Sequence, residues 1–184
     1  MSVNWLAQAV GLGGLAAFLL SFQVKSNRAL LLLQMLACAL FGAQFVLLDA
    51  LSGCLNQGVL LLRDLIILLR DRFPWAKRRA WLWFFLLLIL ACALFSWSGP
   101  ISILPLVATA GSTLAYWQDN ARAYRTANLF CASPCWLAYD LLVGSFAGAA
   151  NEIIALISII ASIVRFGWKG LGENSFEKDG TEKG

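Results

Sequence analysis

Long apolar stretches alternate with short polar connections along this chain. Because a helix rises about 1.5 Å per residue, roughly 20 mostly apolar residues cross the hydrocarbon core of a bilayer. The apolar stretches are continuous, rich in Leu and Ala, and lack the period-two alternation of strands, which favours α-helices. Seven helices are expected, at residues 5–22, 29–48, 51–69, 80–97, 101–117, 127–143 and 146–166.

Composition supports a membrane environment for these helices. Hydrophobic residues make up 60% of the 184 positions and charged residues only 13%, whereas soluble domains are roughly 45–50% apolar and about 25% charged. So few charges cannot cover the surface of a soluble globule, which argues against a soluble enzyme and a disordered chain. The net charge of +4 does not indicate nucleic acid, because the basic residues are spread over separate short loops. The expected partner is the lipid bilayer, and no nucleic acid is expected.

The first stretch admits one other interpretation, a secretory signal peptide. Residues 1–4 carry no Lys or Arg, and no clear A-x-A site follows the apolar run. We therefore expect a retained helix.

The basic residues predict an orientation. They occur in alternate connections, whereas the connections near Asp49, at 98–100 and at 144–145 have no Lys or Arg. Under the positive-inside rule the basic connections are cytoplasmic, which places the N-terminus outside and the C-terminus inside. The basic residues of these connections and of the C-terminal end are Lys25, Arg28, Arg70, Arg72, Lys77, Arg78, Arg79, Arg122, Arg125, Arg165, Lys169, Lys178 and Lys183.

An internal repeat appears when the chain is shifted against itself by 95 residues. The shift pairs the first three predicted helices with the last three without a gap, and the polar and glycine matches are the most informative because those residues are scarce. These matches are Gln23/Gln118, Gly53/Gly148, Asn56/Asn151 and Arg70/Arg165. The first and fifth helices run in the same direction, so the halves are parallel and the fourth helix is the extra crossing.

The predicted fold is therefore an all-α polytopic membrane protein with seven transmembrane helices, in which two parallel triple-helix bundles are joined by a linker helix. Residues 1–73 form the first triple-helix bundle, and residues 74–99 form a basic cytoplasmic loop and the linker helix. Residues 100–168 form the second triple-helix bundle, and residues 169–184 form a disordered cytoplasmic tail, because that segment is polar, contains Gly and mixes both charges.

Two pairs of polar residues lie inside predicted helices at matching depth, Asn56 with Gln57 and Asn151 with Glu152. A polar side chain in hydrocarbon costs free energy unless it has a partner, a water-filled cavity or a function. Asn offers two donors and an acceptor, which suits hydroxyl or amide ligands, and Trp136 suits stacking on a ring-shaped solute. We predict a substrate-binding site made of Asn56, Asn151, Trp136, Gln57 and Glu152. The alternative is that the two Asn residues only hydrogen-bond between helices and stabilise the bundle.

Other charged residues in the helices have simpler interpretations. Glu152 and Asp140 would tune a cavity for cations or relay protons, but Asp140 and Asp49 lie near outer ends, where plain solvation is favoured. Arg63 and Asp64 are adjacent, about 100° apart on a helix, and do not face each other squarely. For Arg63 we favour snorkelling to the cytoplasmic interface.

Enzyme chemistry lacks its usual parts in this sequence. There is no histidine and no G-x-x-x-x-G-K-[ST] phosphate loop, and Ser and Asp show no arrangement of an intramembrane nucleophile. We expect no enzyme activity, no cofactor and no metal. The five cysteines are expected to be small buried hydrophobes without disulfides. The Gly144-x-x-x-Gly148 motif has the form of a close helix contact and is weak evidence for a homo-oligomer.

Several segments resemble one family. The matching segments are Asn4-Trp5-Leu6-Ala7-Gln8-Ala9-Val10-Gly11, Leu104-Pro105, Thr113-Leu114-Ala115, Cys135-Trp136, Gly144-Ser145 and Ile163-Val164-Arg165-Phe166. They resemble the YgjV family of bacterial inner membrane proteins over nearly the whole chain except the tail, which implies a multi-pass protein of the bacterial cytoplasmic membrane. That family is similar in plan to the PQ-loop and SWEET transporters, which implies a SWEET-like 3+1+3 bundle.

The resemblance also implies roles for particular residues. In SWEET sugar transporters, paired asparagines on the third and seventh helices and an aromatic residue on the sixth contact the solute, which implies these roles for Asn56, Asn151 and Trp136. Those transporters carry prolines on helices one, two, five and six, whereas here only Pro105 and Pro134 correspond. We expect a facilitator or carrier of a small polar solute, and the alternative is a non-transporting membrane scaffold or sensor.

Overall fold

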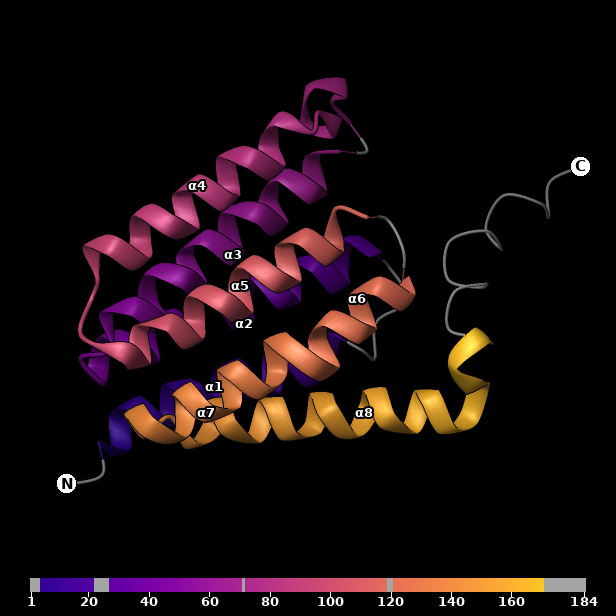
Figure 1. The fold of residues 1–184 in the computed structure, drawn as a ribbon. Coiled ribbons are helices and arrows are strands. Elements are labelled where there is room, and N and C mark those ends of the chain that lie inside the picture. The colour runs from indigo at the N-terminus through magenta and orange to yellow at the C-terminus, as the bar shows by residue number, and fades with distance from the viewer. Residues whose placement is uncertain (1–3, 22–26, 71, 119–120, 171–184) are drawn as a thin grey trace, which may run out of the picture.

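The structure is a computed structural model that describes residues 4–21, 27–70, 72–118 and 121–170 (Figure 1). These residues form helices and turns, with no strand among them. The helices are α1 (Trp5–Ser21), α2 (Asn27–Leu47), α3 (Leu51–Leu69), α4 (Ala80–Phe95), α5 (Ile103–Tyr116), α6 (Ala121–Ala127), α7 (Ser133–Val143) and α8 (Phe146–Gly170). Two short 3-10 turns, Pro74–Lys77 and Pro100–Ser102, precede α4 and α5.

A π-helical segment, Asn128–Ala132, joins α6 to α7 as one continuous helix. The described residues therefore form seven helical segments, which confirms the seven predicted helices and the all-α class. The sixth helix begins at Ala121, earlier than the predicted start at residue 127. Gln23 and the tail after residue 170 lie outside the described residues, so the predicted disorder of the tail is untested.

The π segment has a local cause in the sequence. Pro134 has no backbone N–H and therefore cannot donate to the carbonyl four residues earlier, which interrupts regular α-helical bonding. The neighbouring Ser133 N–H donates instead to the Asn128 carbonyl, a bond of the i to i−5 type. A wider turn therefore lies in the middle of the sixth helix.

Helices that follow each other in the chain also pack against each other. In the first half α2 contacts both α1 and α3, and in the second half α7 contacts both α5 and α8. Helix α4 packs on α3 and α5, while α1 contacts α8 and α3 contacts α5. In Figure 1 the turns that join α2 to α3, α4 to α5 and α7 to α8 all lie at the left-hand end of the bundle.

Two of these turns have the same backbone geometry at positions 95 residues apart. Asp49 (φ 53°) and Gly144 (φ 77°) are both in the left-handed region that ends a helix. The following residue donates to the helix in both turns, from Ala50 N to Phe45 O (2.9 Å) and from Ser145 N to Asp140 O (2.8 Å). The two halves therefore contain turns of the same geometry, separated by the 95 residues of the sequence repeat.

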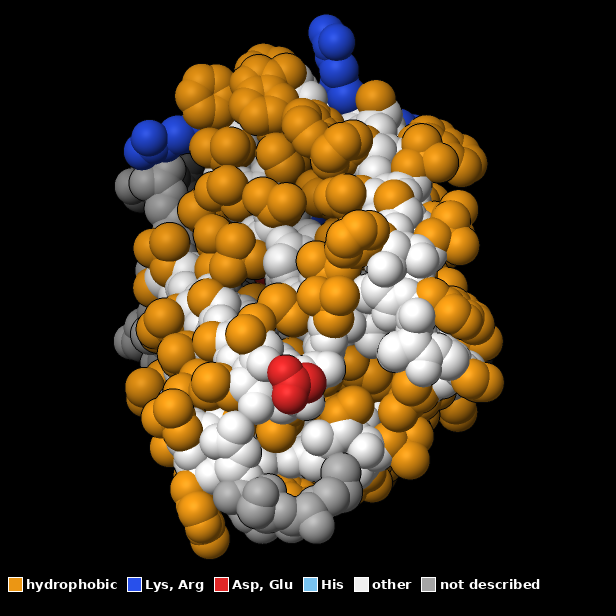
Figure 2. Space-filling model, turned by 90° about the vertical axis from the view of Figure 1, so that its left-hand side faces the viewer, with side chains coloured by type: hydrophobic (Ala, Val, Ile, Leu, Met, Phe, Trp, Pro, Cys, Tyr) orange, Lys and Arg blue, Asp and Glu red, His pale blue; other side chains and the backbone are white. Residues whose placement is uncertain are grey.

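The exterior of the molecule is apolar and its interior contains polar groups. Large hydrophobic side chains are exposed along the helices, including Trp83 and Leu87 on α4 (66% each), and hydrophobic side chains cover most of the face drawn in Figure 2. Among the described helices, α3 is both long and apolar enough to cross a membrane by length and composition, and five further apolar helical stretches are 10–17 residues long. Burying polar groups beneath an apolar surface is typical of a helical membrane protein.

Candidate solute-binding site

Asn56 lies on the buried face of α3. Its side chain is fully buried, and its Nδ2 donates to the Ser52 carbonyl of the preceding turn (2.8 Å). Its Oδ1 is buried and accepts no hydrogen bond. The next residue, Gln57, is half-buried and also has a buried Oε1 that accepts none. Two amide acceptors in succession on α3 are therefore available to a ligand or water.

Asn151 occupies the corresponding position of α8. Asn56 follows the start of α3 at Leu51 by the same interval as Asn151 follows the start of α8 at Phe146. Asn151 is 8% exposed, its Nδ2 donates to Glu152 Oε1 (3.3 Å), and its Oδ1 accepts no hydrogen bond. Leaving a buried acceptor unsatisfied costs about 1–3 kcal/mol, so both amides favour an additional partner.

An aromatic cluster lies between the halves beside Asn56. Trp136 of α7 stacks on Phe45 of α2, with ring centroids 6.0 Å apart and an interplanar angle of 21°, and Tyr139 meets the same Phe45 ring edge-on at 5.6 Å. Trp136 is 6% exposed and Tyr139 1%. Trp136, the predicted aromatic residue of the site, therefore lies in a packed cluster near α3. The rings of Phe45 and Tyr139 cover it.

Tyr139 was not predicted from the sequence, yet it joins α7 to α3. Its hydroxyl accepts from the Gly53 N–H (2.8 Å) and lies 3.0 Å from Ser52 Oγ. A Cβ on Gly53 would lie 2.7 Å from Tyr139 Cε1, so the ring reaches α3 only because residue 53 is glycine. These contacts lie one helical turn before Asn56, toward the Asp49 end of α3. In the sequence, Gly53 is the residue that could have indicated this close contact. Its match with Gly148 was interpreted only as part of the repeat.

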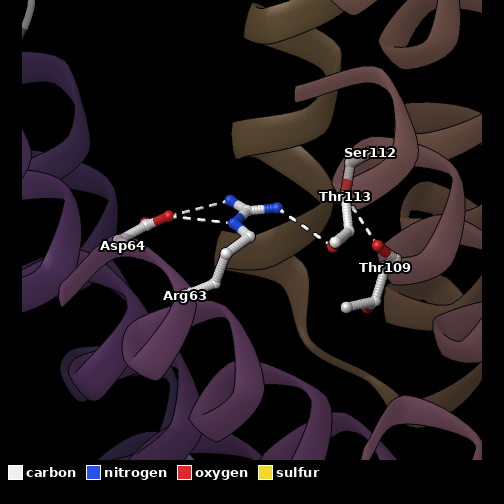
Figure 3. Close-up of polar contacts among 5 residues, drawn as sticks. All are labelled: Arg63, Asp64, Thr109, Ser112 and Thr113. Atoms are coloured by element: carbon white, nitrogen blue, oxygen red, sulfur yellow. Dashed lines mark hydrogen bonds and ion pairs between the residues drawn. The ribbon is translucent and has the colours of Figure 1, made fainter. Parts of the chain in front are cut away.

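A buried ion pair lies within α3 farther along the same helix, and its arginine also reaches α5 (Figure 3). Arg63 Nη2 and Nε donate to Asp64 Oδ1 at 2.9 and 3.1 Å, and Nη1 donates to Thr113 Oγ1 at 3.4 Å. Arg63 is 6% exposed and its guanidinium carbon lies 5.3 Å from the centre of the Tyr116 ring. The prediction that Arg63 snorkels to the interface is therefore wrong. Its long side chain folds back to the adjacent carboxylate, which the 100° separation of their Cα positions seemed to disfavour.

The prediction for Asp140 is also wrong. Asp140 is 3% exposed rather than solvated, because α8 begins directly after the turn and packs against it. A Cβ on Gly148 would lie 2.6 Å from Asp140 Oδ1, so this glycine permits the close contact. Asp49, at the equivalent end of the first half, is exposed, as predicted.

Two contacts that involve the five predicted site residues are established. Trp136 packs in the aromatic cluster with Phe45 and Tyr139, and Asn151 bonds to Glu152 on α8. A cavity of about 400 Å³ lies between α1 and α8 and includes none of the five. It is lined by Trp5, Gln8, Leu12, Phe146, Ala147 and Ala150.

The five cysteines were expected to be small buried hydrophobes. In the structure all five are free thiols and are half-buried rather than fully buried. Within the described part of the chain, no three His, Cys, Asp or Glu side chains come together as a metal site.

The fold and the enclosed polar groups define the class, a helical membrane protein with polar side chains buried between its helices. Residues 5–169 match Imp-YgjV, a family of bacterial inner membrane proteins, and the chain belongs to this family. It is 26% identical over 169 residues to the inner membrane protein YgjV of Escherichia coli (strain K12), which covers 92% of this chain and 88% of that protein. No solved structure matches. The expected resemblance to the YgjV family is confirmed, and the likeness to PQ-loop and SWEET transporters stays a prediction.

Proposed function

We propose that this protein is a multi-pass facilitator or carrier of a small polar solute, with its site between two helix bundles. The site uses Asn56, Asn151, Trp136, Gln57 and Glu152. The N-terminus is outside and the C-terminus is cytoplasmic. The chain acts as a binding and transport protein rather than an enzyme.

One observation carries the proposal. The side-chain oxygens of Asn56 and Asn151 are both buried, both lack a hydrogen-bond donor, and occupy equivalent positions on α3 and α8. Buried polar groups in proteins nearly always have partners, so this matched pair of buried acceptors supports a role in binding a ligand that donates hydrogen bonds. A hydroxyl or amide solute supplies the donors that these oxygens accept.

The arrangement of helices supports a 3+1+3 plan with parallel halves. The two left-handed turns at Asp49 and Gly144 repeat at 95 residues, and each half places its middle helix against both neighbours. Gln8 Nε2 of α1 donates to the Gly144 carbonyl at the start of α8 (2.7 Å), so α1 and α8 begin at the same end. Parallel repeats around a central site are one architecture of secondary transporters.

The distribution of charge supports the orientation. Arg72, Lys77, Arg78 and Arg79 are exposed at the end of the bundle opposite the Asp49 and Gly144 turns. Since cytoplasmic connections carry the excess of Lys and Arg, this end faces the cytoplasm.

Transport is tested by flux into proteoliposomes. Labelled polyols, sugars and small amides that stabilise the purified protein against heat are the first solutes to assay, because a ligand that prefers the folded state raises apparent stability. Asn56→Ala with Asn151→Ala should lower flux at least about tenfold, as loss of buried hydrogen bonds to the solute predicts. Asn4→Ala is the matched control, because Asn4 donates to the Leu47 carbonyl and accepts from Ala7 N–H outside the site. Unchanged flux in the double variant removes the proposed site.

The alternative, a non-transporting scaffold or sensor, is favoured by the Tyr139 contacts, in which polar groups bind helices together. Access of water to residues 56 and 151 distinguishes a carrier from a scaffold or sensor. In a background without the five native cysteines, Asn56→Cys and Asn151→Cys should react with a small hydrophilic thiol reagent if the protein is a carrier. Two unreactive thiols would favour the scaffold.

A further inference from the structure

Asn56 lies between two polar contacts on the same face of α3. Residues 52, 56 and 63 are spaced at i, i+4 and i+11, so they share one stripe of the helix. Ser52 and Gly53 meet Tyr139 of the second half before Asn56, and Arg63 meets Thr113 of the second half after it. At about 1.5 Å per residue, Arg63 lies roughly 10 Å beyond Asn56, toward the basic end of the bundle.

We propose that the Arg63–Asp64 pair, held against Thr113 and Tyr116 of α5, is the cytoplasmic closure of the solute site. This inference rests on the proposed carrier function and assigns the element that controls access to its site from inside the cell. Opening the closure requires α3 to separate from α5, which breaks the Arg63 contacts to Thr113 and Tyr116 but leaves the Arg63–Asp64 pair within α3.

The geometry suits a contact that opens. The bonds to Asp64 are short, 2.9 and 3.1 Å, and stay within α3, so the positive charge keeps its partner when the helices part. The bond across to Thr113 is longer, 3.4 Å, and joins a charge to a neutral hydroxyl. Separating α3 from α5 therefore leaves no isolated charge in the membrane, whose cost would otherwise prevent the motion.

The surface of α5 behind the contact is lined by hydroxyl groups. Thr109 and Thr113 are fully buried on the same face of α5, one helical turn apart, and Ser112 is 8% exposed. Ser112 Oγ donates to the Thr109 carbonyl (3.1 Å), while Thr109 Oγ1 is buried and has no hydrogen-bond partner. Once α3 moves away, the hydroxyl groups of this row become available as hydrogen-bond donors and acceptors for a polar solute.

The test measures from which side a thiol at residue 56 is reached. Asn56→Cys is placed in a background without native cysteines. Its reaction with a membrane-impermeant methanethiosulfonate reagent is measured in right-side-out and in inside-out vesicles. Arg63→Met with Asp64→Asn removes both charges together, so that no single buried charge is left. Tyr139→Phe is the matched comparison, because it breaks a buried contact between the halves on the other side of residue 56. Arg72→Met controls for loss of an exposed cation from the connection that follows α3.

Arg63→Met with Asp64→Asn should raise the rate from the cytoplasmic side by about tenfold or more, because it removes both the hydrogen bond to Thr113 and the contact with the Tyr116 ring. The outer rate should stay unchanged. Tyr139→Phe should raise only the outer rate, and Arg72→Met neither. If the charge-free variant does not elute as a folded protein, Thr113→Val carries the test, with an expected rise of about twofold to tenfold for one hydrogen bond.

Three outcomes overturn the closure. In the first, the thiol at residue 56 reacts from outside, and neither the Arg63 nor the Thr113 variant changes its rate of reaction from the cytoplasmic side. This result refutes the proposed closure and leaves the proposed carrier function standing. Equal increases from both sides show general loosening of the bundle instead of a closure. A thiol that no variant exposes to either side removes both the closure and the proposed function.

Discussion

Two glycines of α3 should respond in opposite ways to the same substitution. A Cβ at Gly53 would lie 2.7 Å from Tyr139 Cε1 and 2.9 Å from Phe45 Cγ. Both are ring atoms of side chains that are 1% exposed, so neither ring has space to move aside. A Cβ at Gly58, in the same helix, meets no atom within 4 Å.

Overpacking of this kind costs about 1–3 kcal/mol, and displacing Tyr139 also weakens its two hydrogen bonds, which contribute about 1 kcal/mol each. Replacing Gly by Ala in a helix regains about 1 kcal/mol. The net prediction for Gly53→Ala is a loss of about 2–4 kcal/mol, which lowers the midpoint of thermal unfolding by roughly 4–16 °C in a chain of this size. For Gly58→Ala only the favourable term remains, and the midpoint should rise by about 2–4 °C.

The measurement is thermal unfolding of both variants in one detergent, followed by helical circular dichroism and by retention of the monodisperse elution peak. Wild-type protein and the two single variants are compared in the same preparation. A Gly53→Ala protein as stable as Gly58→Ala would refute the close contact between α3 and Tyr139, and with it the account of how α7 reaches the first half.

Three further predictions use the same unfolding measurement. Tyr139→Phe should lower the free energy of unfolding by about 1–3 kcal/mol, because the buried Gly53 N–H loses its acceptor; a loss below the error of the measurement would show that this bond contributes nothing. Arg63→Met alone should cost about 3–5 kcal/mol by leaving the Asp64 carboxylate buried without its partner, and adding Asp64→Asn should restore part of the loss; a double variant less stable than the single one contradicts this. Gly144→Ala should cost about 1–2 kcal/mol, because residue 144 has φ 77°, while Asp49→Gly at the equivalent turn should be neutral or slightly stabilising; equal effects at the two turns would contradict the shared geometry.

The helices follow from the sequence because each apolar stretch is bounded by residues that end helices. Gly144 and the Gly99-Pro100 pair mark turns by their own conformational limits. The turn at Asp49 has no glycine, so its left-handed conformation was not predicted, and only the structure shows that it matches the turn at Gly144. The early start of the sixth helix was missed because Arg122, Arg125 and Thr126 interrupt the apolar pattern in residues 121–127.

The candidate site was predictable only in part. The equivalent positions of Asn56 and Asn151 follow from the sequence repeat, and both side chains are buried at the fifth residue after the start of α3 and of α8. The directions of long side chains do not follow, because Arg63 has enough rotatable bonds to reach either the interface or Asp64. Burial of Asp140 depends on how closely α8 approaches α7, which is a tertiary contact that spacing along one helix does not contain.

The wide π turn in the sixth helix has a consequence for how the two halves differ. An extra residue in one turn rotates everything after it by about a quarter of a revolution, and the freed carbonyls make that point softer to bending than the α-helix on either side. In the first half the corresponding helix, α2, is regular throughout. We therefore expect the second half to flex about Pro134 while the first half behaves as a stiff frame, so that a symmetric chain would produce an asymmetric motion.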